Sequence, residues 1–276
     1  MSDIVPAAGT ALVVTFPDPD LADLRRAKQL LESPSLTAQI SNLIGSPLEM
    51  GFKLLPKDWN ARIGGATEAA LLRALQIAVS SLGKPQAGGP AHDRLHKGLT
   101  AVSGAVGGVF GLWSLPVELP VSTTLMLRSI ADIASSEGQD LSLVETRLAC
   151  LEVFALGGKR SSDNAAESGY WIVRASLAQT MSEAIAYVAA RRELADKAAP
   201  PLVRLIAAIA ARFGVQVSAE VAAKALPVVS AVSGAGVNVL FMNHFQNVAR
   251  GHFIVRRLEQ KYGTGAVRRQ YEALRY

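Results

Sequence analysis

The side chains in this sequence that could take part in chemistry are a few isolated charges and one histidine beside a glycine-rich stretch. His96 precedes that stretch, Glu118 follows it between Pro116 and Pro120, and Asp132 lies farther along the chain. A histidine beside a carboxylate can transfer protons as a general acid–base pair. A hydrolase that uses His96 with Glu118 or Asp132 is therefore one hypothesis.

The same charges also suit a purely structural role. Arg128 and Asp132 are four residues apart in an otherwise apolar stretch, and Glu145 follows in the next one. Charges and amides in apolar helices need partners when they are buried. Asn238 is such an amide, and we expect it to bond across to the segment 103–111. The expected outcome is either a polar network that fixes helix register or a ligand pocket, formed by His96, Glu118, Arg128, Asp132, Glu145 and Asn238.

Motifs of common catalytic and cofactor sites are missing from the sequence, including HExxH, GxSxG, GxxxxGK[ST], GxGxxG and CxxC. With 1 cysteine and 4 histidines, a structural zinc site of the Cys/His type is not expected. His92 and His96, and His244 and His252, have helical spacing that could bind a metal through imidazoles. Capping or buried polar histidines explain them more simply, so we expect no metal and no cofactor.

The composition points to helices around a large core. Of the 276 residues, 50% are hydrophobic, 18% are charged and 6% are aromatic, so the apolar half is small and aliphatic. These values exclude a disordered chain, a collagen-like fibre and a disulfide scaffold. Apolar residues recur with helical spacing and no convincing strand is visible. The sequence predicts an all-α fold, a single bundle of about nine or ten helices with two glycine-rich hydrophobic helices in its core.

Several residues mark the expected helix boundaries. Asp20 is a predicted cap for a first helix, and Asp58 opens a stronger one. Gly138 and Gly214 are predicted stops, and the last long helix is expected to end near Gly263, before a short tail helix. We divide the chain into an N-terminal helical arm (1–57) and an all-α domain (58–276).

Two long segments, 98–117 and 225–243, carry no charged residue. Either is long enough to cross a bilayer once, although each is less apolar than a typical span. Both place small residues four apart, which lets two helix backbones approach closely in lipid or in a tight core. We expect a buried helical hairpin, with membrane contact and a constitutive span as the alternatives. The expected close-packing glycines are Gly104, Gly107, Gly108, Gly111 and Gly234.

Basic residues gather at the C-terminal end of the chain, where few acidic residues oppose them. Such an end can rest on anionic lipid, or it can be a solvated helix face. No nucleic-acid motif accompanies it, so nucleic acid is not an expected partner. The candidate membrane-surface residues are Arg250, Arg256, Arg257, Lys261, Arg268 and Arg269.

A family resemblance rests on several runs in a fixed order. The first half has His96-Lys97, SGAVGGVFG (103–111), ELP (118–120) and LRSIADIASSEGQD (127–140). The second half has LPVVSAVSGAGVNVLF (226–241) and ARGHFIVRRLEQKYG (249–263). Together they resemble the EcsC family over about residues 60 to 265, with the first fifty or so residues outside the match. The resemblance implies an α-helical bacterial protein in a membrane-proximal context, because the family is named after a gene beside an ABC transporter linked to exoprotein secretion. It implies no catalytic residue.

Three functions are therefore expected as candidates. The first is a non-enzymatic, membrane-proximal protein that binds an anionic membrane surface or a hydrophobic, lipid-like ligand and is linked to transport or secretion. The second is the hydrolase described above. The third is a scaffold for a membrane transporter. The N-terminus has no run typical of a signal peptide, so we expect a cytoplasmic protein, peripheral on the inner membrane.

Overall fold

The computed structural model describes residues 15–45, 48–82, 115–157, 169–191, 199–226 and 231–274, and within these ranges it contains ten α-helices and no strand. The predicted all-α multi-helix bundle is therefore confirmed. The helices are α1 (Asp18–Leu31), α2 (Leu36–Ile44), α3 (Leu48–Leu54), α4 (Trp59–Ser80), α6 (Leu115–Ser136), α7 (Val144–Leu156), α8 (Gly169–Arg191), α9 (Pro200–Lys224), α10 (Ala231–Tyr262) and α11 (Thr264–Ala273).

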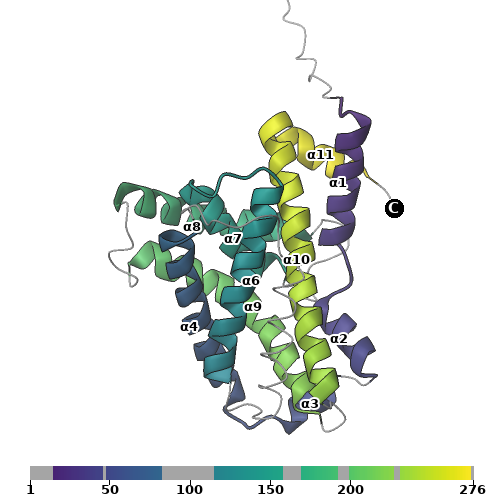
Figure 1. Ribbon diagram of the computed structural model, residues 1–276, viewed down its shortest axis with the longest axis vertical. Coiled ribbons are helices and arrows are strands. Elements are labelled where there is room, and N and C mark those ends of the chain that lie inside the picture. Colours follow the sequence, from purple (N-terminus) through teal and green to yellow (C-terminus); the bar gives the residue numbers. More distant parts are fainter. Residues whose placement is uncertain are drawn as a thin grey trace, which may run out of the picture.

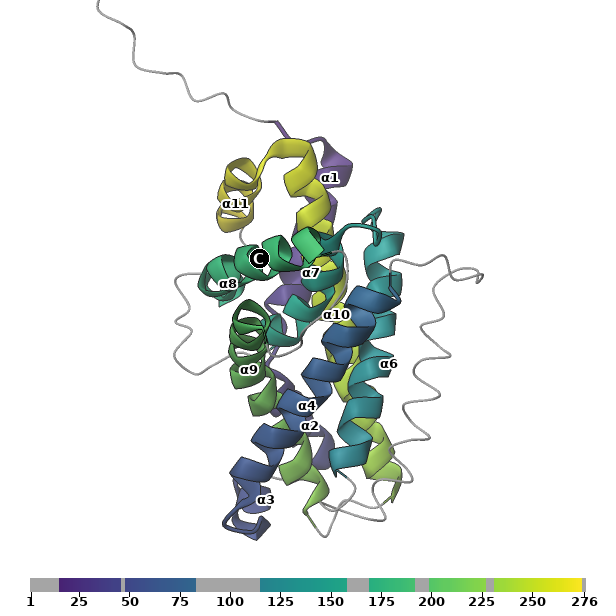
Figure 2. The ribbon, with the colours of Figure 1, turned by 90° about the vertical axis from the view of Figure 1, so that its left-hand side faces the viewer.

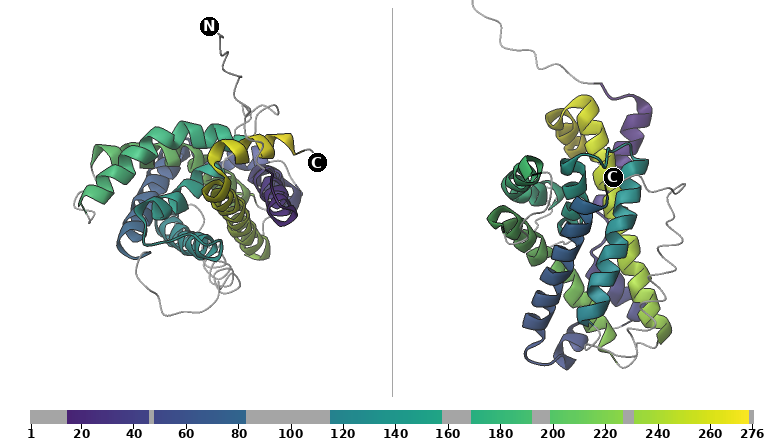
Figure 3. Two further views of the ribbon diagram at one scale, coloured as in Figure 1. Left: turned by 90° about the horizontal axis from the view of Figure 1, so that it is seen from above. Right: turned by 60° about the vertical axis from the view of Figure 1, so that its left-hand side comes forward.

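Helix α10 runs along the long axis of the molecule (Figure 1). α1 and α6 pack along it, α4 packs against α6 and α9, and α8 lies across the bundle beside α7 and α9 (Figure 2). At the upper end, α11 turns back from α10 and lies close to α1 (Figure 3). At the lower end lie α3, the first turns of α6 and α10, and the last turns of α9 (Figures 1 and 2).

Local signals account for several helix ends. Ser35 caps α2 by accepting a hydrogen bond at its Oγ from the amide of Ala38, 3.3 Å away. Gly45, with φ 65°, ends the same helix in the left-handed conformation. Gly138 (φ 79°) follows α6, and Gly263 (φ 82°) separates α10 from α11. The stops predicted at Gly138 and near Gly263 are therefore confirmed.

Two boundary predictions are wrong. Gly214 does not end a helix, because α9 continues to Lys224. Phe213, Gln216 and Val217 are buried on either side of this glycine, and such packing outweighs the cost of about 1 kcal/mol for glycine inside a helix. Asp20 does not cap α1, which begins at Asp18. Its carboxylate accepts hydrogen bonds from Lys261 and Tyr262 of α10 instead.

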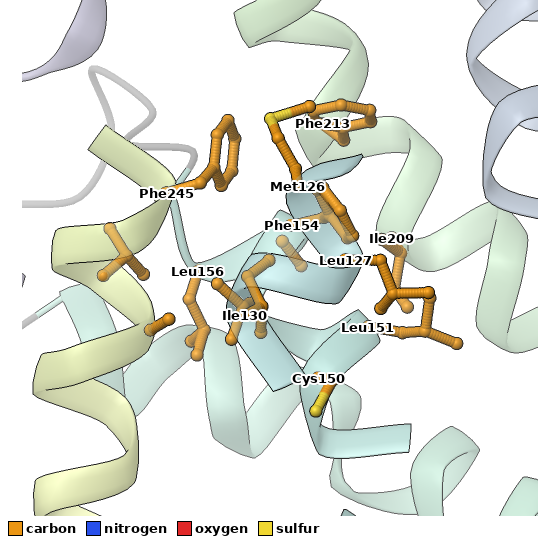
Figure 4. Packing of buried hydrophobic residues seen from close by; sticks show 14 of the residues in the cluster. Met126, Leu127, Ile130, Cys150, Leu151, Phe154, Leu156, Ile209, Phe213 and Phe245 are labelled. Atoms are coloured by element: carbon orange, nitrogen blue, oxygen red, sulfur yellow. The ribbon is translucent and has the colours of Figure 1, made fainter. Parts of the chain in front are cut away.

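Four phenylalanines form the centre of the hydrophobic core. Phe154 of α7 lies 4.9 Å from Phe213 of α9 and 5.5 Å from Phe245 of α10, measured between ring centroids. Phe241, one turn before Phe245, is 6.1 Å from Phe213. Figure 4 shows three of these rings with aliphatic side chains of α6, α7 and α9 around them. We call Phe154, Phe213, Phe241 and Phe245 the phenylalanine cluster.

The first three helices share this core. Leu24 and Ala27 of α1 and Leu36 and Ile40 of α2 are buried in the same hydrophobic cluster as the later helices. α3 lies so close to α9 that a Cβ at Gly51 would stand 2.0 Å from the carbonyl oxygen of Ala222. The division into an arm (1–57) and a domain (58–276) stays a prediction, and helices on both sides of it pack together.

Of the two uncharged segments, the structure describes the second in large part. Residues 231–243 form the first turns of α10, where Gly234 lies within the helix and Val237 and Met242 are buried. Within the described ranges, one helix is long and apolar enough to cross a membrane, and this helix is α9. A buried core helix meets the same criterion, and α9 buries Leu205, Ile209 and Phe213. Outside the described residues lie 98–114 and the predicted close-packing glycines Gly104, Gly107, Gly108 and Gly111.

Candidate functional site

The polar residues predicted to form one network are spread along the bundle. Glu118, Arg128 and Asp132 lie on α6, Glu145 on α7 and Asn238 on α10, and all except Glu145 are at least partly buried. Glu118 is at the lower end of the bundle, whereas Glu145 follows the upper end of α6 (Figure 1). His96 is outside the described residues. The hydrolase that would use it with Glu118 or Asp132 stays a prediction.

Glu118 is held by a lysine of another helix. Lys224 Nζ of α9 lies 2.7 Å from Glu118 Oε1 and 2.8 Å from Glu220 Oε1, and all three side chains are largely buried. Burial alone would lower the pKa of Lys224, but the charges of Glu220 and Glu118 more than offset it and raise the pKa above its usual value. We call this set the lower ion cluster. It ties the start of α6 to the end of α9.

A second polar cluster lies in the upper half of the bundle and was not expected from the sequence. Tyr170 of α8 has its hydroxyl 3.1 Å from Nδ1 of His252 on α10. His252 Nε2 is 3.7 Å from Glu152 Oε2 on α7. Arg174 donates to Glu259 through its two terminal guanidinium nitrogens, at 2.8 and 3.0 Å, and through one of them to the Tyr170 hydroxyl at 3.3 Å. These contacts join α7, α8 and α10, and we call the five residues the upper polar cluster.

Burial sets the protonation of the upper polar cluster. It raises the pKa of Glu152, against the opposing charges of Arg174 and Arg256. It lowers the pKa of His252 well below 6.5, and both arginines lower it further. The Tyr170 hydroxyl accepts a hydrogen bond from Arg174 and shares another with His252 Nδ1, while no described residue forms a hydrogen bond with His252 Nε2. Both titratable groups are therefore biased toward their uncharged forms.

The upper polar cluster differs from an active site in that its side chains are buried away from solvent. His252 is fully buried, and Tyr170 and Glu152 are nearly so. Within the described ranges, no group of three or more His, Cys, Asp or Glu side chains is arranged to hold a metal ion. The cluster instead stabilises the junction of three helices. The signal that could have revealed it is Glu152, a lone charge within the apolar run 148–156.

The basic C-terminal residues are mostly engaged within the protein. Arg256 pairs with Glu145 at 2.6 Å, and Arg257 pairs with Asp23 at 2.7 Å. Lys261 pairs with Asp20 at 2.6 Å, and Arg268 with Glu272 at 2.7 Å. Arg269 is exposed and Arg250 half-buried. The predicted membrane contact of these six residues stays a prediction, and Arg256, Arg257, Lys261 and Arg268 already have acidic partners in the fold.

A different surface, at the lower end, combines exposed apolar side chains with lysines. Met50 and Leu54 of α3 are 56% and 55% exposed, and Leu43 at the end of α2 is 49% exposed. Lys53 and Lys57 are exposed and make no ion pair with any described residue. We call these five residues the α3 surface. Four of the five lie in the run LEMGFKLLPK (48–57), whose lysines among large apolar residues are the sequence signal for this surface.

The fold and these clusters define the class of protein: an all-α bundle with closed polar clusters between its helices. The EcsC protein family model matches residues 21–258. The chain therefore belongs to the EcsC family. The match begins well before residue 60, so the expectation that the first fifty or so residues lie outside it was wrong. No curated protein and no solved structure matches the chain.

Proposed function

We propose that this protein is a non-enzymatic, peripheral membrane protein that docks on a bilayer through the α3 surface and takes up a lipid-like ligand at the same end. The membrane would be the cytoplasmic face of the bacterial inner membrane. The observation that supports this most is the composition of the α3 surface, in which large exposed apolar side chains accompany two exposed lysines that make no ion pair with any described residue.

The chemistry of the α3 surface suits a bilayer interface. Apolar side chains gain free energy by leaving water for the acyl region, and lysines can reach the headgroups while their alkyl stems lie in the apolar layer. Phe52 and Trp59 add a half-buried aromatic pair, with ring centroids 5.6 Å apart. Aromatic rings are favoured at the boundary between headgroups and acyl chains. Glu49 is the acidic residue on this helix, so α3 with Lys57 carries a small net positive charge.

Neighbouring elements extend this apolar end. Val117 and Val121 in the first turns of α6 are 71% and 48% exposed. Both uncharged segments lead into helices that begin at this end, 98–117 into α6 and 225–243 into α10 (Figure 2). The charged upper end, with α1, α11 and the end of α10, would then face away from the membrane.

Vesicle flotation tests the proposal. Burying the exposed halves of Met50 and Leu54 is worth about 1 kcal/mol each, so their joint loss should weaken binding by about thirtyfold. We expect the full chain to float with vesicles of phosphatidylcholine and phosphatidylglycerol, and the Met50→Asp/Leu54→Asp variant to remain in the dense fraction. Lys53→Gln/Lys57→Gln should remove the salt-dependent part of binding only.

Two control variants distinguish docking through the α3 surface from docking through the basic C-terminal end. Leu143 is 54% exposed in the segment before α7, at the opposite end of α6, so Leu143→Asp changes an equally exposed apolar residue away from α3. It should float as the unchanged protein does. Arg268→Gln/Arg269→Gln removes two C-terminal charges and should also float. Binding that survives the α3 variant but is lost in the C-terminal one would overturn the proposal and assign docking to the basic end.

A further inference from the structure

Four buried polar side chains in the lower half of the bundle each have an oxygen atom that receives no hydrogen bond from the described residues. They are Thr67 of α4, Thr123 of α6, Gln216 of α9 and Asn238 of α10, each at most 3% exposed. No described residue bonds to the hydroxyl oxygens of the two threonines or to the side-chain carbonyl oxygens of Gln216 and Asn238. Buried polar atoms are nearly always satisfied, by protein, by water or by a ligand. The four helices that carry them are neighbours in the bundle.

Three of these side chains lie on the same helix faces as hydrophobic residues of the core. Residues three, four or seven apart share a helix face, so Thr123 is in line with Leu127 and Ile130 on α6. Gln216 is in line with Ile209 and Phe213 on α9, and Asn238 with Phe241 and Phe245 on α10. Figure 4 shows Leu127, Ile130, Ile209, Phe213 and Phe245 directed into one core. The three polar side chains therefore face the same interior, beneath the phenylalanine cluster.

The three residues also lie at one level. α9 and α10 are consecutive antiparallel helices, and Gln216 and Asn238 are each one turn below the contact of Phe213 with Phe241. Gln246 Nε2 donates to Ser129 Oγ at 2.8 Å, which sets the level of α10 against α6. From that contact Asn238 is about 12 Å down α10 and Thr123 about 9 Å down α6, at a rise of about 1.5 Å per residue. We call Thr123, Gln216 and Asn238 the inner polar layer.

A threonine in a helix often donates its hydroxyl hydrogen to a backbone carbonyl three or four residues earlier, and Thr123 is unusual in this respect. The adjacent Thr124 donates to the carbonyl of Pro120 at 2.7 Å, and Thr180 donates to Leu177 at 2.9 Å. Thr123, one residue away on the buried face, makes no such bond within the described part of the chain. Its hydroxyl is left for another group inside the bundle.

We propose that the inner polar layer binds the uncharged head of a neutral amphiphile, a hydroxyl or amide donor on an alkyl chain. None of its members is charged, so an ionised head would lose its hydration without a counter-charge. Two amide oxygens accept hydrogen bonds, and the Thr123 hydroxyl both accepts and donates. The layer lies between the phenylalanine cluster and the lower ion cluster, so the chain would extend toward the α3 end. This deepens the proposed function by naming the ligand class.

Calorimetric titration of the full chain without membranes tests the site. The probes are 1-decanol, which has a hydroxyl donor, and decyl methyl ether, which has the same apolar chain and no donor. We expect saturable binding of one decanol per chain, about tenfold tighter than the ether, the value of one buried hydrogen bond. Decanoate should bind more weakly than decanol. Equal binding of decanol and ether, or no saturable binding, would overturn the proposal and leave water as the occupant of the layer.

Variants locate the binding in the inner polar layer. Thr123→Val/Asn238→Leu keeps side-chain volume and removes two polar groups, and it should lower decanol affinity about tenfold or more while leaving ether affinity unchanged. Its melting temperature without ligand should not fall, because no described residue bonds to the Thr123 hydroxyl or to the Asn238 side-chain oxygen. Thr124→Val is the matched control and should bind decanol normally. A large drop in melting temperature with unchanged decanol binding would show that these groups have structural partners instead.

Decanol binding in solution and flotation with vesicles can be lost independently of each other, and the variants distinguish the two losses. The Met50→Asp/Leu54→Asp variant changes the α3 surface only and should bind decanol in solution as the unchanged protein does. If Met50→Asp/Leu54→Asp no longer floats but still binds decanol, both proposals are supported. If Thr123→Val/Asn238→Leu floats normally but no longer binds decanol, the docking surface and the ligand site are separate.

Discussion

Removing Arg174 should reveal how strongly the upper polar cluster stabilises the fold. Arg174 and Glu259 form a two-bond ion pair, at 2.8 and 3.0 Å, between side chains that are 18% and 9% exposed. Arg174 also lies over the rings of Tyr170 and Trp171, 5.4 and 5.2 Å from their centroids. In Arg174→Met the Glu259 carboxylate would stay buried without its partner. Breaking such a pair costs about 3–5 kcal/mol of unfolding free energy.

Urea denaturation of single and double variants measures that value. We expect Arg174→Met and Glu259→Met each to lose several kcal/mol, and the double variant to recover a large part of the loss because no charge is left unpaired. Arg204 and Glu183 are a matched control, since their ion pair is as short, 2.6 Å, but far more exposed, at 56% and 34%. Arg204→Met should leave the denaturation midpoint almost unchanged. A loss below about 1 kcal/mol in Arg174→Met would refute the reasoning that burial makes this pair important.

Three further predictions concern titration, backbone packing and thiol reactivity. Because the pKa of His252 is held below 6.5, the unfolded chain takes up a proton in acid that the folded protein does not, so unfolding free energy should fall by up to about 1.4 kcal/mol per pH unit below pH 6.5. The raised pKa of Glu152 makes unfolding free energy fall as the pH rises above 4.5, which is the opposite trend. The difference in unfolding free energy between the unchanged protein and His252→Gln therefore isolates the contribution of the histidine. Gly51→Ala should lower the melting temperature markedly, since its Cβ would meet the Ala222 carbonyl at 2.0 Å, whereas Gly64→Ala, with nothing within 4 Å, should stabilise helix α4 by about 0.5–1 kcal/mol, as a circular-dichroism melt would show. Burial raises the pKa of Cys150 to about 12, so iodoacetamide should modify it only after unfolding, and fast modification of the folded protein would contradict the buried position.

The helical architecture was predictable because it depends on local patterns. Apolar spacing over many turns and the glycines after α6 and α10 are readable from neighbouring residues alone. Gly214 shows where local sequence patterns fail as predictors, because its buried neighbour Phe213 packs against Phe154 of α7 and Phe245 of α10. Its helix is stabilised by partners that the local sequence does not reveal.

The polar clusters were harder to predict because their members are distant in sequence. Glu118 was recognised as an unusual charge, but its partner Lys224 is 106 residues away, and no spacing rule connects them. Asn238 was recognised because an amide stands out in an uncharged segment. Thr123 and Gln216 were not, since these residue types are common on exposed helix faces. What distinguishes them is burial without a partner, which only the packed structure shows.

If the α3 surface enters a bilayer interface, a fluorescent label placed on that surface should report the change from water to lipid. Leu54→Cys introduces an exposed thiol, while the native Cys150 is buried. An environment-sensitive fluorophore on Cys at position 54 should shift to shorter wavelength when phosphatidylcholine–phosphatidylglycerol vesicles are added. The same fluorophore introduced through Leu143→Cys should not shift. A shift at position 143 with none at position 54 would contradict the account.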